Sequence, residues 1–342
     1  MIHKEAVKNY RPLLSRLSSF GVILQIGQLS VLRLVGKQHD SVRRRRRGFC
    51  RLQGDQGRTI PCYPKAIRKR KERSDMIGAI LGDIVGSRFE FNNYLSKEFA
   101  FLTPGCEFTD DTVMTCAVAQ ALMDSREDFS DLPEKAVAAM QRIGRMFPDC
   151  GYGARFIHWM FSDNPQSYNS CGNGSAMRVS PVGFAARDVE EAKQLSAAVT
   201  RVSHDHPEGM KGAEAAAVAI VMARQGRSKQ EIRAAMEEYY DLSTSVEKYR
   251  RFWQGHGKEI CQVTLPQALA CFLEGESYED VIRNCISIGG DSDTIAAIAG
   301  GIAEAFYGVP VELQSRAKAY LDPRLREICD RFEAWRNERT KG

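Results

Sequence analysis

The sequence predicts an all-α protein, and three observations indicate this class. Helix-start signals recur along residues 76–342, while strict apolar–polar alternation and clusters of β-branched residues are rare there. Two segments, 213–223 and 295–305, are apolar on nearly every side and rich in Ala and Gly. Such helices are normally buried at the centre of a domain. We therefore expect one compact multi-helix domain over residues 76–342.

The boundaries of individual helices follow from capping residues. An N-capping side chain stands three residues before an acid in the pairs Asp188/Glu191, Ser228/Glu231 and Ser277/Asp280. Glycines that follow apolar runs are predicted to end helices in the left-handed conformation; they are Gly226, Gly275 and Gly308. We expect helices at 111–124, 133–146, 188–201, 208–225, 229–240, 265–274, 278–287, 294–307 and 311–320, and a last one after Pro323.

Composition excludes several classes of protein. The 342 residues are 43% hydrophobic and 27% charged, which is typical of soluble globular chains and excludes collagen, wholesale disorder and a polytopic membrane protein. The longest apolar stretch, Phe20–Gly36, is interrupted by polar residues, so we expect no transmembrane helix. The ten cysteines form no CxxC pair, which favours reduced thiols and a cytoplasmic location.

The first 75 residues form a basic extension with 19 Lys and Arg against 5 Asp and Glu, whereas the whole chain has 48 against 43. The runs Arg43–Arg47 and Arg68–Arg73 are compatible with binding to nucleic acid or to an acidic membrane surface. An organellar transit peptide and an arm that docks onto a protein partner are two other readings. We favour a disordered extension, or a stretch not normally translated, before a domain that starts at Met76.

Two acidic segments, Thr109–Thr112 and Gly289–Thr294, each precede a helix that should be buried. Two carboxylates and a hydroxyl within a few residues offer only oxygen ligands, which suits Mg²⁺ or Mn²⁺. Asp and Thr also cap helices, and a single cluster would favour that simpler reading. Two clusters of the same type carry more negative charge than capping uses, so we predict a dinuclear metal site.

Three further segments are candidates for binding or catalysis. The glycine-rich segment Gly172–Arg178 either holds a phosphate group or forms an ordinary turn. Ser203–Glu208 places two histidines beside acids, where they can ligate metal, orient a substrate or cap a helix. In Gly82–Glu90, two glycines four residues apart predict close helix packing, and Glu90 is a candidate for proton transfer.

Taken in order, GDIVGSRFE, TDDT, GNGSAMR, HDHPEG and GGDSDT resemble the ADP-ribosylglycohydrolase family, the group that contains dinitrogenase reductase-activating glycohydrolase. The resemblance extends from Met76 to about Pro310, and residues 1–75 have no counterpart in it. It implies an all-α enzyme with two Mg²⁺ or Mn²⁺ ions that releases ADP-ribose from an ADP-ribosylated protein side chain or a small ADP-ribose conjugate.

The resemblance also implies roles for individual residues. The implied metal ligands are Thr109, Asp110, Asp111, Asp291, Asp293 and Thr294. The candidates for the catalytic groups are Glu90, Asp110 and Asp293. The implied substrate-binding residues are Gly172, Asn173, Gly174, Ser175, Met177 and His204.

Two other functions stay open at this stage. An HD-type metal phosphohydrolase is suggested by His204-Asp205, but it needs a more distant histidine, and we expect the candidate His158 to serve packing. A relative that only binds ADP-ribose is the non-enzymatic alternative. The complete set of metal ligands in this sequence argues against it, because a protein that only binds ADP-ribose would not need to keep that set. We expect a monomer, and the linkage cleaved (arginine, serine or acetyl) is left undecided.

Overall fold

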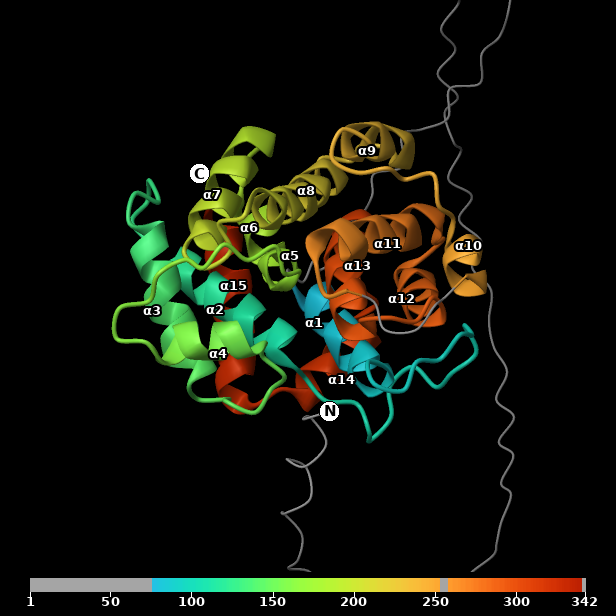
Figure 1. The fold of residues 1–342 in the computed structure, drawn as a ribbon, viewed down its shortest axis with the longest axis horizontal. Helices are drawn as coiled ribbons and strands as arrows, with labels where there is room; N and C mark the ends of the chain where they lie inside the picture. Colours follow the sequence, from blue (N-terminus) through green and yellow to red (C-terminus); the bar gives the residue numbers. More distant parts are fainter. Residues whose placement is uncertain (1–75, 253–257, 340–342) are drawn as a thin grey trace, which may run out of the picture. The chain divides into compact units, whose positions relative to one another are not determined.

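The computed structural model describes residues 76–252 and 258–339, which form helices joined by loops without a β-strand (Figure 1). The predicted all-α class is confirmed. The extension 1–75 lies outside the described residues, and so do both of its basic runs. The elements are α1 (Ile77–Gly86), η1 (Ser87–Phe89), α2 (Asp110–Asp124), α3 (Leu132–Gly144), α4 (Ala154–Phe161), α5 (Gly174–Met177), α6 (Ser180–Ala185), α7 (Val189–Arg201), α8 (Pro207–Arg224), α9 (Lys229–Met236), α10 (Val246–Arg251), α11 (Cys261–Glu274), α12 (Tyr278–Ser287), α13 (Ser292–Tyr307), α14 (Val311–Tyr320) and α15 (Pro323–Arg339).

Helix α13 lies at the centre of the described domain. Every residue from 292 to 305 is buried, and the helix packs against α1, α8, α11 and α12 (Figure 1). Its sequence, rich in Ala, Gly and Ile, allows neighbouring helices to approach from several sides. The prediction of a central, fully buried helix here is confirmed.

Helix α1 packs directly against α13 through a stripe of three glycines. A Cβ atom added to Gly78 would lie 2.6 Å from the Gly300 carbonyl oxygen, and one added to Gly82 would lie 2.1 Å from that of Ala296. At Gly86 the added atom would lie 2.4 Å from Asp293 Cα. The spacing of four residues places the three glycines on one face of α1. The close packing predicted from Gly82 and Gly86 is therefore present, and it brings the end of α1 to the start of α13.

Asp83 of α1 fixes the beginning of α2. This fully buried carboxylate accepts hydrogen bonds from Thr109 N at 3.0 Å, Thr109 Oγ1 at 2.7 Å, Thr112 N at 3.1 Å and the Thr112 hydroxyl. Burial raises the pKa of Asp83 to about 6, although these hydrogen bonds oppose the shift. Four donors on one carboxylate satisfy amides at the helix start and hold the TDDT segment against α1.

The capping predictions are mostly confirmed. Asp188, Ser228 and Ser277 each accept a hydrogen bond from the backbone N–H three residues later. Gly226 and Gly308 have φ of 78° and 75°, as predicted. Gly275 is a correction: its φ is −70°, so it does not adopt the left-handed conformation. A Cβ there would lie 2.4 Å from Val281 Cγ2, so the glycine gives α11 and α12 room to meet.

Most predicted helices end within two residues of the observed bounds, and two do not. Helix α9 ends at Met236 rather than 240, and α11 begins at Cys261 rather than 265. The helices α1, α4, α5, α6 and α10 were not predicted as separate elements; all but α1 have eight residues or fewer. In the described part of the chain, no helix combines the length and apolar character needed to cross a bilayer.

We expect Gly82→Ala to lower the free energy of unfolding by about 2 kcal/mol or more, because the methyl group would meet the α13 backbone and force the two helices apart. Gly105→Ala is the matched control, since nothing lies within 4 Å of the added atom. It should change stability by less than about 0.5 kcal/mol. Urea unfolding followed by circular dichroism measures both. Equal stability of the two variants would contradict the close packing.

Candidate active site

One cavity of about 300 Å³ collects most of the residues singled out in the sequence. Its wall includes both acidic clusters, the glycine-rich segment and His204. The lining residues used below are Glu90, Asp110, Asp111, Asp291, Asp293, Thr294, Gly172, Asn173, Gly174, Met177, Arg178, His204, Tyr168, Arg155 and Glu259. Segments more than 200 residues apart in the sequence therefore meet at a single site.

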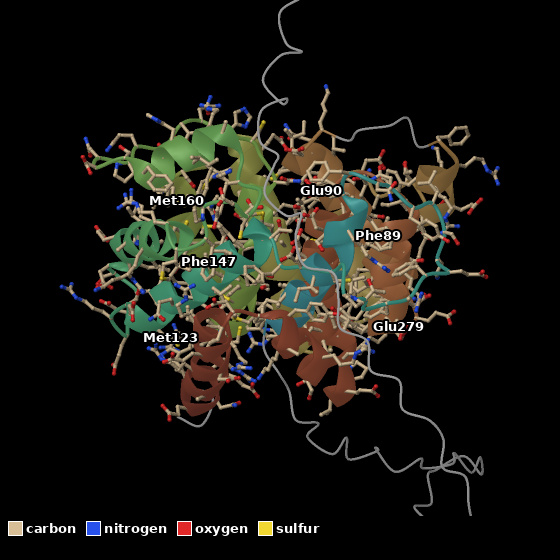
Figure 2. All side chains as sticks on the ribbon, turned by 90° about the horizontal axis from the view of Figure 1, so that it is seen from below. Phe89, Glu90, Met123, Phe147, Met160 and Glu279 are labelled. Atoms are coloured by element: carbon tan, nitrogen blue, oxygen red, sulfur yellow. The ribbon has the colours of Figure 1, made fainter. Side chains whose placement is uncertain are left out.

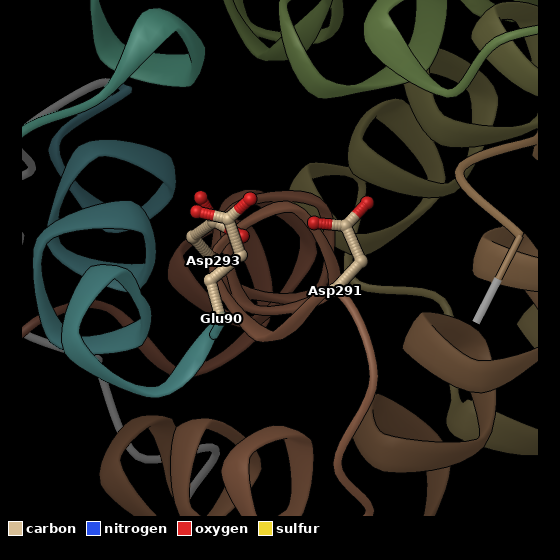
Figure 3. Close-up of side chains that lie close together, drawn as sticks. All are labelled: Glu90, Asp291 and Asp293. Atoms are coloured by element: carbon tan, nitrogen blue, oxygen red, sulfur yellow. The ribbon is translucent and has the colours of Figure 1, made fainter. Parts of the chain in front are cut away.

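The tightest acidic group consists of Glu90, Asp291 and Asp293. One carboxylate oxygen from each lies within 4.8 Å of the other two (Figure 3). Asp291 is the N-cap residue of α13 and Asp293 lies in its first turn, whereas Glu90 follows η1. Figure 2 shows Glu90 beside Phe89, on the segment that follows α1. The close packing of α1 on α13 thus brings Glu90 to the other two acids.

The second cluster meets the first through Thr294. The Thr294 hydroxyl donates to Asp111 Oδ2 at 3.1 Å, which links the first turn of α13 to that of α2. Asp110 N donates to the Cys150 carbonyl at 2.7 Å, and this bond joins the start of α2 to the loop that precedes α4. Both clusters stand at helix N-termini, where the helix dipoles favour negative charge.

Two buried oxygens in these clusters, Asp111 Oδ1 and Asp293 Oδ1, have no hydrogen-bond partner among the described residues. Burial, followed by neighbouring carboxylates, raises the pKa values of Asp110, Asp111 and Asp293 well above their usual range. Unpartnered carboxylate oxygens that face one another are costly unless a cation neutralises them. The donor set contains only oxygen and therefore fits a hard divalent cation.

The glycine-rich segment bonds directly to the acidic group. Asn173 Nδ2 donates to Asp291 Oδ2 at 2.5 Å and to Thr264 Oγ1 at 2.9 Å. The backbone N–H of Asn173 donates to the Glu259 carbonyl at 3.2 Å. Asn173 therefore fixes the segment that starts α5 relative to Asp291.

His204 lines the cavity beside the glycine-rich segment. Arg178 Nη2 donates to Ser203 Oγ at 2.8 Å, and the same hydroxyl shares a hydrogen bond with His204 Nδ1, 2.9 Å away. This bond uses Nδ1 and leaves Nε2 for contact with a ligand. Burial lowers the pKa of His204 well below its usual value and keeps the ring neutral. Nε2 lies 3.4 Å from the position of a Cβ on Gly174, so the glycine leaves the ring accessible.

Not every residue from the sequence analysis reaches the cavity. Thr109 is absent from the lining; its hydroxyl donates to Asp83 and accepts from Asp111 N at 3.3 Å. Ser175 is fully buried, and its hydroxyl donates to the Gly172 carbonyl at 3.0 Å. Of the catalytic and metal candidates, Glu90, Asp110, Asp111, Asp291, Asp293 and Thr294 do line the cavity.

The geometry gives no support to an HD-type site. Asp205 accepts hydrogen bonds from Ser167 Oγ at 2.8 Å and Asn169 N at 2.7 Å. It therefore fixes a loop and does not line the cavity beside His204. His158 is exposed on α4, and the expectation that it serves packing was wrong. The polar helix face at this point turns His158 outward, whereas Trp159 and Met160 turn inward.

Sequence reasoning missed several residues of the site. Glu259 and Arg155 line the cavity but stand outside every recognised motif. Asn93 bonds both to the segment around Glu90 and to Gly290. Its position three residues after Glu90 was the only signal available. A single exposed-looking polar residue in a loop is too common to indicate such a contact.

Comparison with known proteins agrees with these motifs. The profile of the family described as ADP-ribosylglycohydrolase matches residues 65–341. The human ADP-ribosylhydrolase ARH3 is 27% identical over 72% of this chain and 89% of its own length. The ADP-ribosyl-[dinitrogen reductase] glycohydrolase of Rhodospirillum rubrum is 26% identical over 75% of this chain and 92% of its own.

A solved structure described as an ADP-ribosylglycohydrolase-related protein complex shares the fold. Its TM-score is 0.56 at 24% identity, with 78% of this chain and 97% of that chain covered. The profile match begins at residue 65, eleven residues before Met76, and includes all five motifs in the order in which they line or support the cavity. The chain therefore belongs to the ADP-ribosylglycohydrolase family.

Proposed function

We propose that this protein is a metal-dependent hydrolase that releases ADP-ribose from an ADP-ribosylated protein side chain or a small ADP-ribose conjugate. The observation that carries the proposal is the composition of the cavity. Its lining combines a concentrated acidic group with unpartnered buried oxygens and, next to it, the glycine-rich segment and His204. A ligand with a diphosphate and a ribose has groups that fit both parts of this lining.

We assign five residues as ligands of two divalent cations, Mg²⁺ or Mn²⁺: Asp110, Asp111, Asp291, Asp293 and Thr294. Glu90 lies close enough to act as a further ligand. The Thr109 hydroxyl keeps one lone pair after its two hydrogen bonds. It supports the set of metal ligands indirectly, by accepting a hydrogen bond from Asp111 N. When bound, such cations polarise sugar hydroxyls and lower the pKa of a coordinated water.

The remaining residues bind and orient the substrate in this proposal. The segment Gly172–Gly174 and the Nε2 atom of His204 line the part of the cavity that takes the anionic oxygens, and Met177 adds an apolar contact there. Ser175 holds the turn in shape through Gly172. The neutral ring of His204 can donate without a change in charge.

Cleavage of a glycosidic bond also needs a proton for the leaving group. We assign this role to Glu90, because it lines the cavity beside Asp291 and Asp293 and because, in the metal-free protein, burial and the nearby Asp291 and Glu259 raise its pKa to about 7. A carboxyl with that pKa can hold and release a proton at neutral pH. Asp110 and Asp293, which also line the cavity, orient the attacking water in this proposal.

The experiment that tests the proposal is an assay of the full-length protein with Mg²⁺ and a panel of substrates. Proteins ADP-ribosylated on arginine or on serine, and acetyl-ADP-ribose, are incubated separately, and free ADP-ribose is measured by chromatography. Release from at least one substrate supports the hydrolase. Binding of ADP-ribose without release from any of them would favour the binding-only alternative instead.

We expect chelation by EDTA to abolish release of ADP-ribose and added Mg²⁺ or Mn²⁺ to restore it, because the acidic group offers only hard oxygen ligands. The same metals should raise the melting temperature of the metal-free protein, since they bind only the folded site. Full turnover in excess chelator would exclude the metal-dependent reading.

We expect Asp110→Asn and Asp293→Asn each to lower turnover at limiting Mg²⁺ by at least about 100-fold, because each variant removes a charge that holds the cation. Without metal, both variants should melt at the same temperature as wild type or higher, since one buried carboxylate no longer repels its neighbours. The exposed Asp163→Asn is the control. Wild-type turnover in either site variant would remove that residue from the ligand set.

The basic extension is proposed to be dispensable for turnover. Removal of residues 1–75, so that the chain starts at Met76, should leave the melting temperature and the turnover of a small ADP-ribosylated substrate unchanged. We also propose that the protein is a cytoplasmic monomer. Gel filtration of the same preparation tests its oligomeric state. If turnover survives truncation but binding to nucleic acid or a protein partner is lost, the extension is an arm.

A further inference from the structure

Among the contacts that hold the loop after Glu90, the anchor at its far end comes from α12. Arg283 donates to the carbonyls of Lys97 at 2.7 Å and Phe99 at 2.9 Å. Its guanidinium also lies 4.8 Å from the centre of the Phe99 ring. These contacts fix residues 97–99 but act seven or more residues away from Glu90. The part of the loop that carries Glu90 needs its own anchor.

The second anchor is the side chain of Asn93. Its Nδ2 lies within donor distance of the carbonyls of Phe89 at 2.8 Å, Glu90 at 3.0 Å and Gly290 at 2.9 Å. Its Oδ1 accepts from Gly290 N at 2.9 Å. Both polar atoms of one amide are thus used, and they join two segments 197 residues apart.

The partner segment is the turn that leads into α13. Gly289 and Gly290 have φ of 68° and 89°, a region that glycine adopts without strain. Two consecutive glycines also leave many alternative conformations open, so this turn requires outside contacts to be fixed. Asn93 gives Gly290 a reciprocal pair of hydrogen bonds directly before Asp291.

We propose that Asn93 is a positioning residue: it joins the Glu90 segment to the Gly289–Gly290 turn and thereby holds Glu90 beside Asp291 and Asp293. The inference rests on the proposed function, because it concerns the same acidic group. Asn93 does not touch the substrate in this account. It acts through hydrogen bonds to the backbone on either side of the group.

The test is a double-mutant cycle that uses Mn²⁺ alone as the probe. Metal-free full-length protein is titrated with Mn²⁺, and the free ion is followed by electron paramagnetic resonance. Asn93→Ala and Glu90→Gln should each weaken Mn²⁺ binding by about tenfold. The double variant should bind no more weakly than Glu90→Gln, because Asn93 acts through Glu90. In the hydrolysis assay, Asn93→Ala should lower kcat about tenfold and leave KM within about twofold.

Asn92→Ala is the matched control, since this neighbouring asparagine is exposed. It should bind Mn²⁺ and turn over as wild type does. Additive effects of Asn93→Ala and Glu90→Gln, or wild-type affinity in Asn93→Ala, would overturn the positioning role, even if the melting temperature falls. If wild type binds Mn²⁺ but releases no ADP-ribose, the proposed function fails while the cycle still decides the role of Asn93. Absence of Mn²⁺ binding by wild type would overturn both.

Discussion

The contact between α1 and α13 is the constraint on which the rest of the site depends. Because Gly78, Gly82 and Gly86 have no side chains, one face of α1 lies directly against the backbone of α13. This contact fixes the end of α1 against the first turn of α13, at Asp293. Because Asp83 of the same helix binds the start of α2, the two acidic clusters are positioned by a single helix.

The same arrangement concentrates negative charge in a buried place. Asp83 is balanced by four donors, whereas Asp111 and Asp293 each keep an oxygen without a described partner. The first is therefore a structural carboxylate, and the others are poised for a ligand that the protein does not supply. A site of this kind costs stability in the metal-free chain, which is usual where function requires charged groups close together.

The cavity combines this acidic wall with a wall that favours anions, and a short chain of contacts keeps the two in register. Asn173 bonds to Asp291, and its backbone belongs to the segment that His204 faces. Arg178 and Ser203 then hold the ring of His204 through its Nδ1 atom. A ligand that contacts both groups would be oriented by residues whose relative positions are already fixed.

The sequence determined the helical class, most helix limits and the residue types of the site, because capping side chains, apolar periodicity and clustered carboxylates are local signals. The short helices α4, α5, α6 and α10 and the conformation of Gly275 were decided by packing. Tertiary structure alone also separated Asp83 from the other acids, removed Thr109 and Ser175 from the cavity wall, and recruited Glu259 and Asn93. These assignments depend on contacts between residues that are far apart in the sequence, such as Asn93 and Gly290. Local sequence patterns do not predict such contacts, because each partner alone resembles an ordinary loop residue.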